Sequence, residues 1–165
     1  KGNQIGKSIR EDNCDSIIDD IFKTAQNNSC SIIFPEDVMV GKSIEDKAQI
    51  KELNELKNDD YILDIGPKTI NKIKDIINKS KTVLWNGPAG YFENPNFAIG
   101  SYEIAKMIIQ KNKKNLIYSV AGGGDTIALL NQMNAINDFN FVSTAGGAFL
   151  EYLEGKELPG IKALN

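Results

Sequence analysis

The sequence predicts an α/β fold, a Rossmann-like three-layer αβα sandwich with a mainly parallel sheet, as one domain over residues 1–165. Short apolar runs alternate with amphipathic helical patterns, which is typical of βαβ units with helices on both faces of a parallel sheet. Two glycine-rich turns each lie between an apolar run and a helical pattern. The 165 residues are enough for one domain with a sizeable core, or for a large piece of a bigger protein.

The first half of the chain predicts one helix and one strand. Residues 1–12 are polar and expected to be irregular. A helix is expected over 13–28, where Ile17, Ile21 and Ala25 share a face. Ser31-Ile32-Ile33-Phe34 is expected to be a short strand that ends at Pro35, with Asp37 in the loop beyond it.

Residues 41–60 are highly charged and predict a surface excursion with a short edge strand near 50–53. The tripeptide Gly-Lys-Ser occurs at 6–8 and again at 41–43. Neither copy has the earlier glycine of a phosphate-binding P-loop, so we expect both in loops.

The second half predicts a regular alternation of strands and helices. Pro67 is well placed to begin a helix, because its fixed φ suits the first helical position. The expected elements are a strand at 61–65, a helix from Pro67, a strand at 81–85, a helix over 98–111, a strand at 115–119, a helix at 127–133 and a strand at 139–142 that runs into the small-residue turn 143–148.

The turn Gly122-Gly123-Gly124-Asp125-Thr126 is the main candidate site. A strand that passes through glycines into a helix leaves free N–H groups at the positive end of the helix dipole, where a phosphate can bind. Asp125 could cap those amides or face a cation, and Thr126 offers a hydroxyl to a phosphate oxygen. The alternative is a plain strand-to-helix turn with Asp125 as its N-cap.

The carboxyl ends of parallel strands meet at one edge of a sheet. We therefore expect Gly66, residues 86–93, residues 122–126 and residues 143–147 to converge there, around a nucleotide or another phosphate ligand. Trp85 and Phe92 could stack on a base, although ordinary core aromatics are the favoured interpretation.

Composition excludes several classes of function. A net charge of −3 gives no general attraction to nucleic acid or to anionic membranes, and no apolar run approaches the ~20 residues that span a bilayer. The opening Lys1-Gly2-Asn3-Gln4 has no apolar signal segment. Cys14 and Cys30 form no C-x-x-C motif, so we expect two buried or idle thiols in a reducing cytoplasm. The absence of histidine excludes Ser-His-Asp and Cys-His catalysis, whereas phosphoryl transfer needs no imidazole.

Five motifs stand out along the chain, at Asp64-Ile65-Gly66-Pro67, residues 85–93, residues 122–126, residues 143–148 and residues 153–160. In order and in approximate spacing they resemble the phosphoglycerate kinase family. Residues 1–8 and Phe34-Pro35-Glu36-Asp37 add to the resemblance, which covers nearly the whole chain and matches the nucleotide-binding, C-terminal half of that enzyme.

The resemblance implies a role for each matching residue. Gly66 and Tyr91 would lie at the adenine, Pro88 would contact the nucleotide, and Glu93 would accept hydrogen bonds from the ribose hydroxyls. Asn86, Gly122, Gly123, Gly124 and Thr126 would lie at the phosphates of ATP or ADP, with Asp125 on Mg²⁺. Gly124 and the amides of Gly146 and Gly147 would face the phosphoryl group in transit between 1,3-bisphosphoglycerate and ADP.

The sequence also departs from the family pattern. Tyr91 stands where a small aliphatic residue is usual, Ala145 replaces a glycine, which is harmless if its φ is negative, and Phe149 replaces a small polar residue. The family's N-terminal domain, which binds 3-phosphoglycerate, is not in this chain, nor is an earlier Gly-Gly-Ala-Lys segment. We therefore expect part of a nucleotide-binding domain that is inactive alone and belongs to a monomeric cytoplasmic enzyme. The alternatives are a non-catalytic nucleotide-binding module and an interaction domain with a decayed site, against which the intact Glu93, Asp125 and Thr126 argue.

Overall fold

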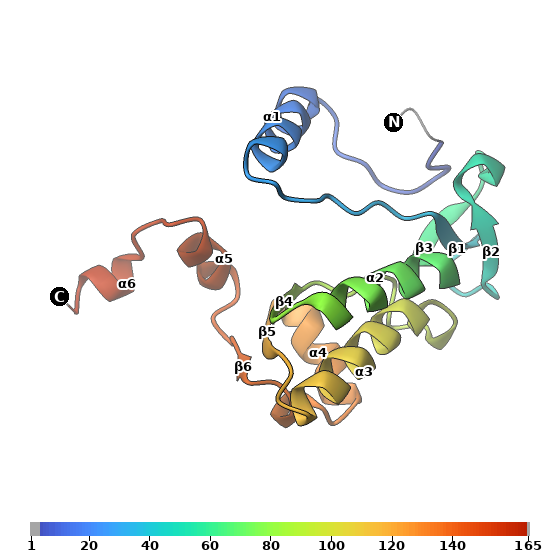
Figure 1. The fold of residues 1–165 in the computed structure, drawn as a ribbon. Coiled ribbons are helices and arrows are strands. Elements are labelled where there is room, and N and C mark those ends of the chain that lie inside the picture. Colours follow the sequence, from blue (N-terminus) through green and yellow to red (C-terminus); the bar gives the residue numbers. More distant parts are fainter. Residues whose placement is uncertain (1–3, 165) are drawn as a thin grey trace.

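A computed structural model describes residues 4–164 and shows a mixed α/β protein with two three-stranded sheets (Figure 1). Residues 1–3 and 165 lie outside the description, and with them the start of the segment expected to be irregular. Residues 4–12 form turns, bends and coil, as expected.

The first sheet is parallel and has the strand order β4 (Thr82–Asn86), β5 (Tyr118–Gly122), β6 (Phe141–Val142). One of its faces packs on three helices, α2 (Pro67–Lys79), α3 (Ile99–Lys113) and α4 (Gly124–Gln132). Trp85 and Ala121 from this face join a core with Ile108 of α3 and Leu129 of α4. The predicted strand–helix alternation is confirmed here, although β5 lies three residues later than the expected 115–119 and β6 keeps only the last two residues of 139–142.

The opposite face of the parallel sheet is largely open. Leu84, Tyr118 and Phe141 are 46%, 53% and 51% exposed. Helices α5 (Gly147–Leu153) and α6 (Pro159–Lys162) approach it, around an apolar cavity of about 410 Å³. Helices thus lie on both faces of the parallel sheet, as expected, although α5 and α6 cover the second face only in part.

The second sheet is antiparallel, in the order β2 (Gln49–Glu52), β1 (Asp37–Gly41), β3 (Tyr61–Ile65). The expected strand at 61–65 and the edge strand near 50–53 are confirmed, but β3 does not join the parallel sheet. Asp37 begins a strand instead of lying in a loop. The sheet to which β3 belongs and the strand at Asp37 were not predicted, because the sequence pattern can indicate a strand without identifying the strand that pairs with it.

Helix α1 (Asp15–Asn27) is confirmed within the range 13–28, but it stands away from both sheets and has no buried residue (Figure 1). Its Phe22 ring stacks on Phe34 with a centroid separation of 5.9 Å. Residues 31–34 are extended coil and not the expected strand. A strand needs a neighbour to pair with its N–H and C=O groups, and an apolar run alone does not provide one.

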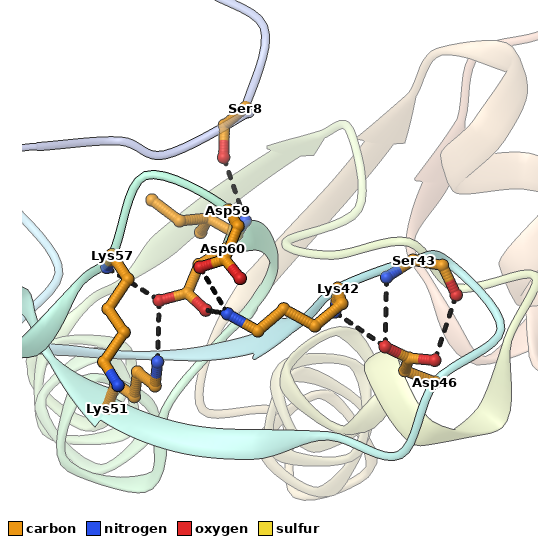
Figure 2. Close-up of polar contacts among 9 residues, drawn as sticks. Ser8, Lys42, Ser43, Asp46, Lys51, Lys57, Asp59 and Asp60 are labelled. Atoms are coloured by element: carbon orange, nitrogen blue, oxygen red, sulfur yellow. Dashed lines mark hydrogen bonds and ion pairs between the residues drawn. The ribbon is translucent and has the colours of Figure 1, made fainter.

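A buried carboxylate holds the base of the hairpin formed by β1 and β2 (Figure 2). Asp60 is 1% exposed, and it accepts hydrogen bonds from the ammonium groups of Lys42 and Lys51 at 2.7 Å each and from the N–H of Lys57 at 2.8 Å. Burial opposes ionisation of Asp60, but these donors outweigh it and hold the pKa of the carboxyl well below its usual range.

Three short 3₁₀ helices complete the described elements, at Leu53–Glu55 (η1), Pro95–Phe97 (η2) and Ile136–Asp138 (η3). Both cysteines are free thiols, and Cys30 is exposed and not buried. Within residues 4–164, no helix combines the length and the apolar character needed to cross a bilayer.

Candidate functional site

The candidate site begins where β4 and β5 end side by side. Asn86 pairs with Gly122 in the parallel ladder, and the chain then passes through Gly123 into α4. Gly123 has φ +87°, and a Cβ there would lie 2.2 Å from Oδ1 of Asn86. Glycine is thus required both by the backbone conformation and by the close approach of the Asn86 amide.

The first turn of α4 presents an open N-terminus. Gly123 is the N-cap and no side chain caps the helix, so the alternative in which Asp125 is the N-cap is not supported. Asp125 is exposed in the first turn, and a Cβ on Gly124 would meet nothing within 4 Å. The first N–H groups of a helix have no intrahelical partner and lie at its positive end, which suits an anion.

Thr126 connects the turn after β4 to the start of α4. Its side chain is fully buried, and its Oγ1 accepts the N–H of Gly87 at 2.7 Å. Gly87 itself has φ +92°. The hydroxyl therefore fixes the turn after β4 against the start of α4, and its expected contact with a phosphate stays a prediction.

A third turn lies at the carboxyl end of the parallel sheet, after β6. The N–H of Ser143 donates to the carbonyl of Ala121 at 2.8 Å, which places the turn beside the end of β5. Gly146 has φ +55° and precedes α5, and nothing lies within 4 Å of a Cβ built on Gly146 or Gly147. Ala145 is not among the residues with positive φ, so its side chain causes no backbone strain.

Phe149 of α5 packs against this edge from the open face of the sheet. A Cβ on Gly122 would lie 2.5 Å from two ring carbons of Phe149. The ring also lines the apolar cavity of about 410 Å³ with Leu84, Val120 and Phe141. The departure from the family pattern at this position thus joins α5 to the turn that follows β5.

A cavity of about 390 Å³ lies between β3 and the turn that follows β4. The N–H of Tyr91 donates to the carbonyl of Leu63 at 2.7 Å and holds the two walls together. Pro88 and Tyr91, both predicted to bind the nucleotide, line this cavity, whereas Ile62 and Leu63 were not predicted, since nothing in the pattern shows that β3 approaches this turn. The lining residues are Pro35, Val38, Ile62, Leu63, Asp64, Ile65, Pro88, Ala89, Gly90 and Tyr91.

Gly66 is outside this lining and has a different neighbour. A Cβ there would lie 2.3 Å from Cγ of Asp37, whose carboxylate accepts the N–H groups of Lys68 at 3.0 Å and Thr69 at 2.9 Å. Burial opposes ionisation of Asp37, but these hydrogen bonds lower its pKa below the usual value. Gly66 therefore allows Asp37 to cap α2, and its predicted place at the adenine stays a prediction.

A second cavity of about 390 Å³ lies on the other side of Tyr91. It separates the turn that carries Glu93, whose side chain is exposed, from the loop between β1 and β2. Tyr91 lines both cavities. The residues around the second one are Ile44, Glu45, Tyr91, Glu93, Asn94, Pro95 and Asn96.

Asp64 supports the floor of the first cavity. It is 1% exposed and accepts the N–H groups of Ile65 and Gly100 at 2.8 Å each. Burial raises the pKa of Asp64 to about 6, although these hydrogen bonds act in the opposite direction. Gly90 and Gly100 pack directly on the carboxyl group, since a Cβ on either would lie within 2.5 Å of it.

Two of the predicted aromatic residues belong to the core. Trp85 and Phe92 are 8% and 7% exposed, and Trp85 stacks on Phe139 at a centroid separation of 6.3 Å. The favoured interpretation, that both are core aromatics, is confirmed.

The structure brings together most of the predicted phosphate-contacting residues but forms no complete metal site. Within residues 4–164, no three His, Cys, Asp or Glu side chains converge. The single exposed carboxylate of Asp125 suits Mg²⁺, which is commonly held by one or two carboxylates together with substrate phosphates and water.

Comparison with known proteins agrees with this geometry. The profile of the phosphoglycerate kinase family matches residues 1–156. The phosphoglycerate kinases of Chelativorans sp. (strain BNC1) and Azorhizobium caulinodans are 42% and 43% identical over 166 residues, which cover 99% of this chain and 42% of each relative. The solved phosphoglycerate kinase of Coxiella burnetii superposes with a TM-score of 0.89 at 37% identity, over 99% of this chain and 42% of the other.

The phosphoglycerate kinase of Pyrococcus horikoshii gives a TM-score of 0.70 at 28% identity, over 99% of this chain and 40% of the other. This chain thus spans about two fifths of the length of the relatives that it matches. With a matching profile over nearly all of its residues and the same arrangement of strands and helices, the chain belongs to the phosphoglycerate kinase family.

Proposed function

We propose that this chain, residues 1–165, supplies the Mg-nucleotide half of a phosphoglycerate kinase. That enzyme would transfer a phosphoryl group reversibly between 1,3-bisphosphoglycerate and ADP, giving 3-phosphoglycerate and ATP. The observation that carries the proposal is the packing of Asn86 against Gly123 and of Gly87 on Thr126. It joins two glycine-containing turns at the end of a parallel sheet, beside a cavity of about 390 Å³, a suitable size for a base.

The nucleotide would extend over three parts of this edge. Its base would occupy the cavity lined by Leu63, Pro88 and Tyr91. Its ribose hydroxyls would donate to Glu93. Its phosphates would meet Asn86 and the N–H groups of Gly124, Asp125 and Thr126 at the start of α4.

The transferring group would face Gly124, Gly146 and Gly147, where no side chain stands between the backbone and a ligand. When bound at Asp125, Mg²⁺ supplies positive charge at the phosphate oxygens. The residues of this chain contribute oriented N–H donors that match the charge developing on those oxygens.

The 3-phosphoglycerate site and its cationic groups would belong to an N-terminal domain outside these residues. The length of the relatives, more than twice that of this chain, supports this division. We therefore expect the chain alone to bind nucleotide without turnover, as a non-catalytic module would. The complete enzyme would be a cytoplasmic monomer of glycolysis.

A titration with Mg-ADP tests the proposal directly. Trp85 is the single tryptophan and adjoins Asn86, so its fluorescence should report on occupancy. A saturable signal, weaker in Asp125→Ala than in the parent protein, would support the site. A millimolar affinity corresponds to only about 4 kcal/mol and is sufficient for this test. Silence in both fluorescence and calorimetry would reject nucleotide binding by this chain.

A further inference from the structure

The loop between β1 and β2 is tied to the turn that carries Glu93. The Nδ2 group of Asn94 donates to the carbonyl of Ile44 at 2.6 Å, and Nδ2 of Asn96 donates to the carbonyl of Asp46 at 3.3 Å. Both bonds join residues 50 positions apart in the sequence. The second cavity lies between the two segments that they connect.

The hairpin loop has a fixed shape of its own. The Asp46 carboxylate accepts the N–H groups of Lys42 at 2.7 Å and Ser43 at 3.1 Å, together with the Ser43 hydroxyl at 3.1 Å (Figure 2). Lys42 in turn holds the buried Asp60. The loop is therefore braced at its base by an ion cluster and at its tip by a carboxylate cap, so it can act as a rigid support.

Asn94 is the residue that transmits this support to the Glu93 turn. Its N–H donates to the carbonyl of Tyr91 at 3.2 Å, and its Oδ1 accepts the N–H of Asn96 at 2.9 Å, which caps η2. Tyr91 is anchored separately, to Leu63 of β3. Glu93 thus lies between two anchored residues, although its own side chain is exposed.

We propose that Asn94 is a positioning residue for sugar recognition and that it holds Glu93 for the 2′- and 3′-hydroxyls of a ribonucleotide. This inference rests on the proposed nucleotide site and adds the hairpin as its support. A carboxylate on a braced turn loses less conformational freedom when it accepts a hydroxyl, so the bond contributes more to affinity. Without the amide donor of Asn94, the sugar-dependent part of the affinity is lost, while base and phosphate contacts remain.

Calorimetric titration with two ligands separates this role from a general structural one. Mg-ADP carries both hydroxyls, and Mg-2′,3′-dideoxy-ADP carries neither. Asn94→Asp keeps an oxygen for the N–H of Asn96 but replaces the donor to Ile44 with a second oxygen. We expect this variant to lose about three- to tenfold in affinity for Mg-ADP, as for one hydrogen bond of typical strength, with dideoxy-ADP binding unchanged.

Three further variants complete the design. Glu93→Gln should remove the preference for ADP over dideoxy-ADP, and Asn94→Asp should cause no additional loss on that background. Asn94→Ala should resemble Asn94→Asp in ligand preference. Asn96→Ala is the matched control, because its bond is longer and lies on an exposed side chain, and it should bind both ligands like the parent.

Each other result has a definite meaning. Equal loss for both ligands in Asn94→Asp would show a merely structural role, and unchanged affinity for both ligands would show no role; either overturns the inference alone. A parent protein that binds both ligands equally also overturns it and leaves nucleotide binding intact. A parent that binds neither overturns the proposed function and this inference with it.

Discussion

The side-chain oxygen of Asn86 occupies the space beside Gly123 that a Cβ would need, at 2.2 Å from the Cβ position. This contact is what brings the turn after β4 against the start of α4. It makes glycine obligatory at position 123, where the backbone has φ +87° as well. The neighbouring Gly124 has neither constraint. Gly123 is therefore required for packing, whereas Gly124 leaves the N-terminus of α4 accessible to a ligand.

We expect Gly123→Ala to destabilise the fold by about 2 kcal/mol or more, because the positive φ and the overlap with Asn86 both oppose a methyl group. Gly124→Ala should leave the free energy of unfolding unchanged or raise it slightly, since it lies in a helix with open space around it. Urea unfolding measures both. The Gly124→Ala protein should nevertheless bind Mg-ADP more weakly, because its methyl group would hold a phosphate away from the amides.

Asp64 should make stability fall as the pH rises from about 4 to 6. Its pKa in the folded protein is about 6, above the ordinary value of 3.8 for an aspartate, so between these values the folded state holds a proton that the unfolded state has lost. The stabilisation is fully present below pH 4 and is lost as the pH passes 6, by about 3 kcal/mol in total. Urea unfolding at pH 4.5 and 6.5 measures the slope.

The control for this prediction is Asp64→Asn, which has no charge to lose. It should be less stable than the parent at low pH, because one oxygen that accepts an N–H is replaced by an NH₂ group. Its stability should not fall over the interval from pH 4.5 to 6.5 through this group. An equal slope in both proteins would show that another residue causes the pH dependence.

Asp60 should act in the opposite sense and at lower pH. Its pKa is held well below the usual range, so its contribution is present above the unfolded pKa and is lost as the pH falls below about 4. Asp60→Asn should therefore destabilise the protein by about 2 kcal/mol at neutral pH, because the ammonium groups of Lys42 and Lys51 lose a buried partner. Asp59→Asn is the matched control, since Asp59 bonds to Lys42 from an exposed position, and it should have little effect on thermal unfolding.

Sequence patterns predicted the features of this fold that depend on neighbouring residues, but not those that depend on distant ones. The turn at 122–126 and the helix after Pro67 were predictable, because glycine and proline restrict the backbone locally. The neighbours of β3 and the failure of 31–34 to form a strand were not, because pairing depends on residues far away in the sequence. The cavity wall formed by Ile62 and Leu63 was missed for that reason. The same limit applies to Asp37, whose role as the cap of α2 is formed across 31 residues.

The open apolar face of the parallel sheet should make this chain self-associate. Leu84, Tyr118 and Phe141 are all about half exposed and lie on one face, and β4 is an edge strand in the described sheet. Exposed apolar surface beside an unpaired strand edge promotes association between copies. We expect a mass above that of the monomer by size-exclusion chromatography with light scattering, increasing with concentration.

The double variant Leu84→Thr and Phe141→Thr should shift the protein toward the monomer, because threonine keeps the strand propensity but removes apolar area. A well-behaved monomer in the parent protein at all concentrations would contradict this prediction.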